Sequence, residues 1–377
     1  MAGESLSRRL LRRVPFAVGL VAILALLNVA VGATYDQVAG RRPAPAPLWS
    51  PLGDPAVQGS RWSTPAMAGR SWTSAYAHEI SALRYRYQSF LTYDQVDHHG
   101  TYVNVTDGIR RSWAAPAARS APRPVVSING GNLAFGVGQR DGHTVASELA
   151  RLAAADGTPI DVRNAGRPGW TTWQSMLGYE RDLASRAPPD IALFLGGMED
   201  LTGQPNADGR LSFADLPGLQ SAALGTTESE GRWDRVKASY ARLSVVHRAA
   251  RWAGLGSDRS RGAPHPLVLG SAQAAEGASA NARAWALVRG LAAQNGVVAR
   301  SYWQPLLVAE PAAARRAVAH LGPGTVDLSG LAKGHRGEFL DPGDVNEAGA
   351  RALARRLWVD VRPDVERWYR THPATGG

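Results

Sequence analysis

Short apolar runs alternate with segments of helical spacing from residue 125 onward, and this alternation constrains the fold of the chain more than any other feature. The runs that we expect to form strands are Val125 to Asn129, Ile160 to Arg163, Ile191 to Leu195, Leu267 to Gly270 and Val297 to Tyr302. The segments with helical spacing are Val145 to Ala155, Thr172 to Ala184, Trp233 to Ala253, Ala280 to Ala293 and Glu347 to Trp358. This pattern predicts an α/β protein of three layers, in which helices cover both faces of a five-stranded parallel sheet.

The first 34 residues predict a membrane anchor. Four arginines lie within residues 1–13, and an uncharged stretch of 21 residues follows at 14–34. As a helix this stretch would be about 31 Å long, the thickness of a bilayer core. Basic residues stay on the cytoplasmic side, so we expect a single-pass cell-membrane protein whose C-terminal part is extracytoplasmic. The alternative is a signal peptide cut after Ala33, although its apolar core would be unusually long.

Composition divides the remainder into three parts. Residues 35–75 are rich in Pro, Gly, Ala and Ser and predict a linker. Residues 76–120 contain strand-like patterns and predict an N-terminal extension, and residues 121–370 form the main domain.

Charge and cysteine content exclude several classes of function. The formal charge is +10, but only two of the 42 basic residues are Lys and the arginines are scattered. We therefore expect no nucleic-acid partner. The chain has no cysteine, which excludes disulfides, thiolate zinc sites and cysteine nucleophiles.

Glycine-rich and polar turns follow the expected strands. In parallel sheets the ligand lies beyond the carboxyl ends of the strands, where the strand order reverses. The turns after the first three strands are Asn129 to Gly136, Asn164 to Gly169 and Gly196 to Asp200. A fourth polar block, Phe339 to Gly349, precedes the last helix.

These four blocks resemble those of the SGNH hydrolases, also called GDSL-like esterases. The matching residues are Gly130, Gly131, Phe135 and Gly136, then Asn164, Gly166 and Gly169, then Gly197 and Asp200, and last Asp341 and Gly349. The resemblance covers about residues 80 to 358 and includes the extension at Tyr102 to Arg111, which is similar to the segment preceding this domain in membrane-anchored bacterial members. It implies a flavodoxin-like sheet and a serine-esterase site.

The site positions implied by the resemblance carry other residues. Asn132 stands at the nucleophilic serine, Asp344 at the histidine base and Glu199 at the oxyanion-hole asparagine. An amide is not a nucleophile, a carboxylate of ordinary pKa is a poor base for serine, and an acidic side chain cannot donate to an oxyanion while charged. Only Gly166, a backbone donor, is retained. We expect the serine-esterase machinery to be lost.

The replacement residues should meet in one cleft. If Asn132, Glu199, Asp341 and Asp344 converge, the three acids need protons, cations or an arginine partner, and Arg167 is the candidate that follows Gly166. We expect no resident cofactor; the alternatives are a Ca²⁺ or Mg²⁺ site and acid/base chemistry on a sugar bond.

Two tryptophans follow the second block. Trp170 and Trp173 could stack on a sugar beside the cleft, or could pack in the core at helical spacing. The polar segment Thr202 to Gly231 is either a lid or a long loop.

Three hypotheses for the function remain open. The first is a pseudoenzyme that binds a glycan or a partner protein. The second is an active acyl esterase or O-acyltransferase with non-standard catalytic residues, and the third is an envelope scaffold. The resemblance implies a context of cell-surface polysaccharide modification, with an integral-membrane acyltransferase as a possible partner.

Overall fold

The computed structural model describes part of the chain. The described residues are 27, 30, 61–116, 122–205, 212–213 and 266–373. The chain divides into two units, and all described residues except Leu27 and Ala30 belong to the unit formed by Leu48–Leu216 and Ser260–Gly377. The helix expected at Trp233 to Ala253, most of the expected membrane segment and most of the polar segment after Thr202 lie outside the described residues. Within the described ranges, no helix is both long and apolar enough to cross a membrane.

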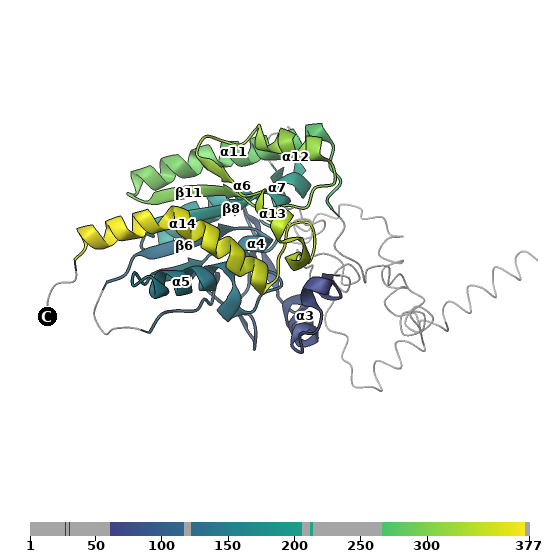
Figure 1. Cartoon of the computed structure of the whole chain (residues 1–377), viewed down its shortest axis with the longest axis horizontal. Coiled ribbons are helices and arrows are strands. Elements are labelled where there is room, and N and C mark those ends of the chain that lie inside the picture. Colours follow the sequence, from purple (N-terminus) through teal and green to yellow (C-terminus); the bar gives the residue numbers. More distant parts are fainter. Residues whose placement is uncertain are drawn as a thin grey trace, which may run out of the picture. The chain divides into compact units, whose positions relative to one another are not determined.

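A mixed sheet of eight strands forms the centre of the described unit (Figure 1). In spatial order the strands are β12 (Thr325–Asp327), β11 (Val298–Trp303), β8 (Ile191–Gly196), β6 (Val125–Gly130), β7 (Asp161–Asn164), β5 (Ile109–Arg110), β4 (Asn104–Thr106) and β3 (His98–His99). The first five are parallel. Their chain order across the sheet is fifth, fourth, third, first, second, which is the flavodoxin-like order and confirms the expected five-stranded parallel sheet.

One of the five expected strands is wrong. Leu267 forms only an isolated bridge with Val308, and the run Leu267 to Gly270 adds no strand to the sheet. Its neighbour Val268 is 78% exposed. The outer parallel strand is instead Thr325–Asp327, which pairs with Ser301–Trp303. An apolar run in the sequence does not show which edge of the sheet is free. Thr325–Asp327 is only three residues long and lacks an apolar run, so the sequence pattern does not predict it as a strand.

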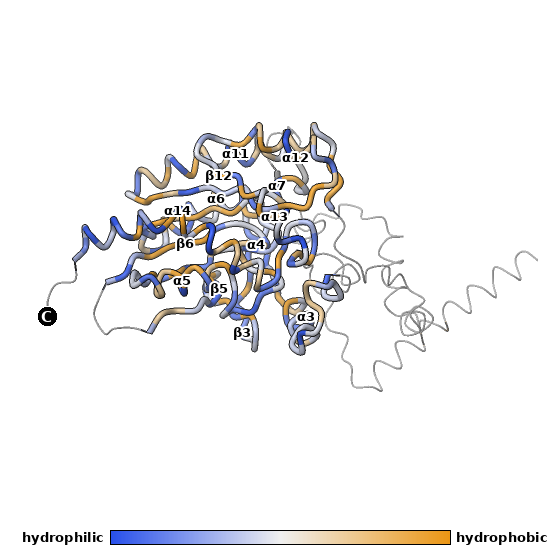
Figure 2. Tube along the Cα trace, in the orientation of Figure 1, coloured by the Kyte–Doolittle hydropathy of each residue, from blue (hydrophilic) through white to orange (hydrophobic). Residues whose placement is uncertain are grey.

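The two faces of the sheet are covered by different helix pairs. α5 (Val145–Ala155) packs against α14 (Glu347–Thr371), and α6 (Thr172–Ser185) packs against α11 (Ser271–Gln294). Strand β8 shows the division, because Leu193 and Leu195 join the core with α5 and α14, whereas Phe194 joins the core with α6 and α11. This alternation follows from the two-residue period of a strand. Figure 2 shows β6 as mainly apolar and the segments around β3 and β5 as mainly polar.

Shorter elements complete the described fold. They are η1 (Pro65–Met67), α3 (Thr73–Ser81), the antiparallel hairpin of β1 (Tyr85–Gln88) and β2 (Thr92–Gln95), α4 (Asn132–Phe135), η2 (Asp141–His143), α7 (Met198–Thr202), the pair β9 (Gln204–Pro205) and β10 (Ser212–Phe213), α12 (Pro311–Val318), α13 (Leu331–Gly334) and η3 (Arg336–Glu338). α4 follows β6 directly and α7 follows β8, so both helices begin at the carboxyl edge of the sheet.

The segment 61–75 is part of the fold and does not form the extended linker that its composition predicts. It contains η1 and the start of α3, and Ala66 and Met67 are buried. Asn346, which caps the N-terminus of α14, donates from its amide to the carbonyl of Ala66 at 2.8 Å. Tyr76 of α3 is fully buried, and its hydroxyl accepts a hydrogen bond from Gly138 N–H at 2.9 Å. The N-terminal segment is therefore attached to the elements that surround the carboxyl edge of the sheet.

Arg110 joins the extension to the parallel sheet. Strand β5 meets β7 through one residue pair, Arg110 with Asn164, so backbone pairing contributes little there. The Arg110 side chain is fully buried, pairs with Asp141 at 3.0 Å and donates to the carbonyls of Phe135, Gly136 and Gln139. Its guanidinium also lies 4.6 Å from the centre of the Phe135 ring. This one side chain fixes the turn after β6.

We predict that Arg110→Met destabilises the protein strongly. The substitution removes the buried ion pair with Asp141 and one donor from each of the carbonyls of Phe135, Gly136 and Gln139. Removing one partner of a buried pair costs about 3 to 5 kcal/mol. The free energy of unfolding in urea measures this. Arg111→Met is the matched control, because Arg111 contacts the same Asp141 at 3.3 Å from a side chain that is 63% exposed. Equal effects of the two substitutions would contradict the assigned role.

Candidate functional site

Four polar side chains meet where the strand order reverses. Asn132 begins α4 after β6, and Glu199 lies in α7 after β8. Asp341 and Asp344 lie in the loop before α14. The carboxyl groups of Glu199, Asp341 and Asp344 lie close enough for their charges to interact. The structure thus brings together the four positions that the sequence blocks suggested, and we call this cluster of Asn132, Glu199, Asp341 and Asp344 the cleft.

Asn132, in the first block, forms hydrogen bonds with residues of the second and third blocks. Its backbone N–H donates to Glu199 Oε1 at 2.6 Å, and its side-chain oxygen accepts from Gly169 N–H at 2.9 Å. The carboxylate of Glu199 lies so close to Gly131 that an added Cβ there would be 2.2 Å from Glu199 Cδ. Asn132 is therefore held by hydrogen bonds on both its backbone and its side chain, and any side chain at position 131 would displace Glu199.

Glu199 is 6% exposed, and burial raises its pKa to about 7. The hydrogen bond from Asn132 opposes this shift, whereas the charges of Asp200 and Asp341 add to it. Glu199 consequently exchanges its proton near neutral pH, where an ordinary glutamate is fully ionised.

Asp341 and Asp344 share a tight turn. Asp341 Oδ1 accepts the N–H groups of Gly343 and Asp344 at 2.8 and 2.7 Å. Asp344 is 1% exposed, and neither of its carboxyl oxygens has a hydrogen-bond partner in the described part of the chain. Burial, and then the charges of Asp341 and Glu199, raise the pKa of Asp344 well above its usual range. These effects favour a protonated Asp344.

Arg61 supplies the positive charge of the cleft. Its guanidinium forms an ion pair with Asp341 and a second one with Asp344 at 3.5 Å. The side chain is 14% exposed, so solvent screens these pairs only in part. Sequence reasoning missed Arg61 because it lies in a stretch whose composition predicts a linker. The three acids of the sequence blocks predict a cationic partner, but they do not indicate where in the chain the arginine lies.

Arg167 does not balance these acids, contrary to our expectation. It pairs with Asp94 of β2 at 2.9 Å and donates to the carbonyls of Ala165 and Gly166. Both members of this pair are buried. The turn after β7 directs the Arg167 side chain toward the β1–β2 hairpin, so Arg167 joins the hairpin to the sheet.

Trp170 and Trp173 pack in the interior and do not present a stacking face to the cleft. Trp170 is 3% exposed, its indole N–H donates to the carbonyl of Tyr93 at 3.2 Å, and its ring lies against Gly178. Trp173 packs on the core between α6 and α11. Their helical spacing reflects core packing, the alternative that the sequence left open.

The backbone donors that could stabilise an oxyanion are already bonded. Gly166 N–H donates to the side-chain oxygen of Asn164 at 3.1 Å, and the N–H of Asn132 donates to Glu199. An added Cβ at Gly166 would lie 2.2 Å from Phe135 N, so the close approach requires glycine. Oxyanion stabilisation depends on free donors aimed at the reacting atom. Neither of these two donors is free.

Two histidines that precede the fourth block, His320 and His335, have partners of their own. His320 contacts the carbonyl of Arg316 within its own helical segment, and His335 pairs with Glu338 at 3.0 Å. Neither forms a hydrogen bond with a hydroxyl group among the described residues. Ser127 is buried inside β6 and accepts from the amide of Asn129.

Asp200 of the third block has a structural role. It accepts hydrogen bonds from Gly197 N–H, from both the N–H and the hydroxyl of Thr172, and from the amide of Asn281. These bonds tie the end of β8 to the first turn of α6 and to α11. Asp200 therefore positions the turn that carries Glu199.

Arg61 pairs with two of the acids that the sequence offered as ligands for a Ca²⁺ or Mg²⁺ ion. Among the described residues, no group of three or more His, Asp or Glu side chains is arranged to hold a metal. The guanidinium of Arg61 lies where an ion bridging Asp341 and Asp344 would have to bind. Both ions require several oxygen ligands.

This chain is similar to several solved structures described as acylhydrolases or carbohydrate esterases. No family model and no curated protein sequence matches the chain. The solved structures that match include a lipase/acylhydrolase from Enterococcus faecalis, with 13% identity over 64% of this chain and 96% of the other, at a TM-score of 0.32. A family 3 carbohydrate esterase of Clostridium thermocellum matches with 14% identity over 66% of this chain and 99% of the other, at 0.31. An acetyl xylan esterase matches with 15% identity over 63% and 99%, at 0.27.

Superpositions at these TM-scores carry no argument about the site. The strand order and the four blocks at the strand ends carry the assignment. The chain has an SGNH-hydrolase-like fold. Its cleft departs from a serine-esterase site at the nucleophile, the base and the oxyanion donors, and Arg61 occupies part of the same cleft.

We predict that Glu199→Gln reduces the pH dependence of stability. The pKa of Glu199 is about 7 in the folded chain against an ordinary value of 4.5, so the folded state holds the extra proton between these pH values. The free energy of unfolding therefore falls as pH rises through this window, by about 3 kcal/mol. Glutamine keeps the acceptor for Asn132 N–H but does not titrate. Across this window the free energy of unfolding of the variant should fall less than that of the wild type. At about pH 8 the variant should therefore have the higher free energy of unfolding.

Urea unfolding at a series of pH values measures this difference. Glu276→Gln is the control, because Glu276 is exposed on α11, and its curve should run parallel to that of the wild type. Parallel curves for Glu199→Gln and the wild type would show that Glu199 does not titrate in this window.

We also predict that Arg61→Met destabilises the protein by about 3 kcal/mol near neutral pH, because it removes the cation from a largely buried pair of carboxyl groups. Arg70→Met is the matched control, since Arg70 lies in the same segment and contacts Glu347 only at 3.8 Å. Thermal or urea unfolding of both variants provides the comparison. A loss no greater than that of the control would mean that the acids are neutralised without Arg61.

Proposed function

We propose that this chain is a membrane-anchored, extracytoplasmic protein that retains an SGNH-hydrolase-like fold without serine-esterase activity. In this proposal it binds a cell-surface glycan, or a partner such as an integral-membrane acyltransferase, during modification of envelope polysaccharide. The anchor and the orientation depend on residues 1–34, whose sequence predicts a spanning helix with its basic end in the cytoplasm.

One observation carries the loss of catalysis. The nucleophile position is an asparagine whose N–H donates to Glu199 and whose side-chain oxygen accepts from Gly169. Covalent catalysis needs a nucleophile, a base within hydrogen-bond reach and free oxyanion donors. The cleft instead holds an amide, acids neutralised by Arg61 or by protons, and backbone N–H groups that already donate hydrogen bonds. Removing a nucleophile alone costs about a million-fold in rate in a well-studied protease.

A second function is favoured by a different observation. Glu199 has a pKa of about 7 in a buried cleft beside two other acids, and perturbed acids are typical of acid/base catalysts. An acyl esterase or O-acyltransferase with non-standard residues would use this group as its base. The alternative still lacks a nucleophile, and we therefore rank it second.

We expect the purified full chain to hydrolyse p-nitrophenyl acetate no faster than its Asn132→Ala variant, because Asn132 supplies no nucleophile. The assay compares initial rates of the two proteins with that of the uncatalysed reaction. A third protein that combines Asn132→Ser, Glu199→Asn and Asp344→His restores the side chains of the resembled blocks and tests whether the scaffold can still support the reaction. Wild-type turnover that disappears in Asn132→Ala would favour the second function.

A further inference from the structure

A polar groove lies between the β1–β2 hairpin and α6, away from the cleft. It has a volume of about 700 Å³ and is lined by Arg86, Gln88, Gln95, Asp97, Arg181 and Asp182, among others. Clefts of this size hold small ligands. The cleft at Asn132 is partly filled by Arg61, and Trp170 is buried, so a ligand needs another surface.

The charge of the groove selects against strongly charged ligands. Three guanidinium groups and four carboxyl groups line it, and several are already paired with each other. Arg181 contacts Asp94 at 2.7 Å and Asp182 at 3.8 Å. A polyanion would meet the carboxylates and a polycation would meet the guanidinium groups. A neutral ligand with many hydroxyl groups avoids both penalties.

Several polar groups of the groove have hydrogen-bonding capacity to spare. Gln95 is 3% exposed, and neither atom of its amide has a partner in the described part of the chain. A buried amide without partners is costly, and so it points to a ligand that would satisfy it. Within the described ranges, Arg86 forms no ion pair and Gln88 makes no side-chain hydrogen bond. Together they offer donors and an acceptor, which is what a hydroxyl group requires.

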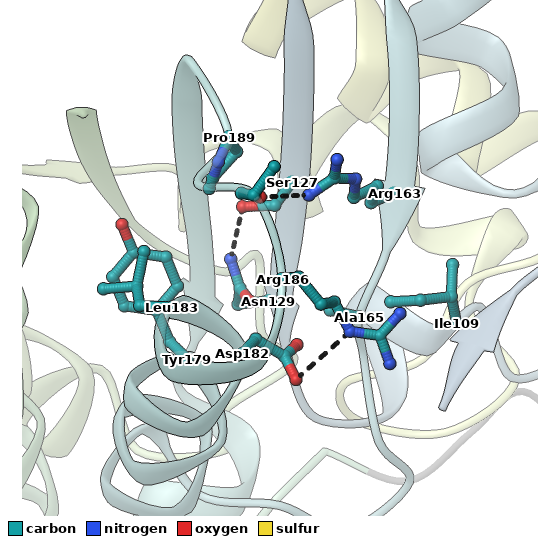
Figure 3. Close-up of a pocket in the computed structure, with 11 residues that line it drawn as sticks. Ile109, Ser127, Asn129, Arg163, Ala165, Tyr179, Asp182, Leu183, Arg186 and Pro189 are labelled. Carbon is teal, nitrogen blue, oxygen red and sulfur yellow. Dashed lines mark hydrogen bonds and ion pairs between the residues drawn. The ribbon is translucent and has the colours of Figure 1, made fainter. Parts of the chain in front are cut away.

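A smaller recess adjoins the groove (Figure 3). Asp182 and Arg186 line both cavities, and their side chains are 3.8 Å apart. Inside the recess, Tyr179 is 2% exposed and its hydroxyl has no hydrogen-bond partner among the described residues. Ser127 and Asn129 form a hydrogen bond on the same wall. The recess has a volume of about 20 Å³, which is room for one water molecule.

We propose that the groove between the β1–β2 hairpin and α6 binds a neutral saccharide segment, and that this surface, rather than the degenerate cleft, is the glycan site. The proposal rests on the glycan-binding form of the proposed function. Arg86, Gln88 and Gln95 bind hydroxyl groups in the groove.

Titration calorimetry of the full chain with four probes tests the site. The probes are cellotetraose, xylotetraose, mannotetraose and N-acetylchitotetraose. We expect at least one to bind, Arg86→Ala to weaken that binding about tenfold through loss of a charged donor, and Arg289→Ala on α11 to leave it within about twofold. Ser185→Trp should abolish binding, because Ser185 is exposed and a large ring there fills the groove.

Gln95→Met separates binding from folding. It removes an unpaired buried amide at nearly constant shape, so the thermal midpoint should rise while the affinity falls. A merely structural role of Gln95 would lower both or leave the affinity unchanged.

Three outcomes would overturn the inference: no probe binds at about 1 mM, binding survives Arg86→Ala and Ser185→Trp, or Gln95→Met leaves the affinity unchanged. Binding that is lost only in Asp341→Asn would move the glycan to the cleft and leave the proposed function intact. Asn132-dependent ester hydrolysis would instead reject the proposed function, whatever the groove variants show.

Discussion

The structure of the cleft depends on one constraint: two neighbouring carboxyl groups are largely buried there. Asp341 and Asp344 are three residues apart in one turn, and Glu199 lies within range of both. The chain meets this constraint in two ways, with the guanidinium of Arg61 and with protons favoured by burial. Because Arg61 belongs to the N-terminal segment, docking of that segment and the ionisation of the cleft are one linked equilibrium.

The changes in the cleft form a consistent set. Asn132 offers no nucleophilic group, and its side-chain oxygen accepts a hydrogen bond from Gly169 N–H. A glutamate at position 199 gives up a side-chain donor and accepts the backbone N–H that an oxyanion would use. Each replacement stabilises the resting structure where a catalytic residue would have to remain available.

Much of the fold and the location of the cleft could be predicted from sequence, because both depend on local patterns. Helix α5 begins and ends at the expected residues, and the polar blocks lie at the strand ends. The remaining features depend on contacts between distant residues. The apolar run at Leu267 to Gly270 does not show that the sheet edge is taken by Thr325–Asp327. Nor does the position of Arg167 next to Gly166 show that Asp94, 73 residues earlier, is its partner.

The ion pairs of Arg61 also determine which substitutions this part of the chain can accept. A single change of Asp344 to histidine would remove one of the two carboxyl groups that pair with Arg61. Loss of Arg61 alone would leave Asp341 without its counter-charge. A change at any one of positions 61, 341 and 344 therefore alters the charge balance at the other two, so these three positions, far apart in the chain, can change safely only together.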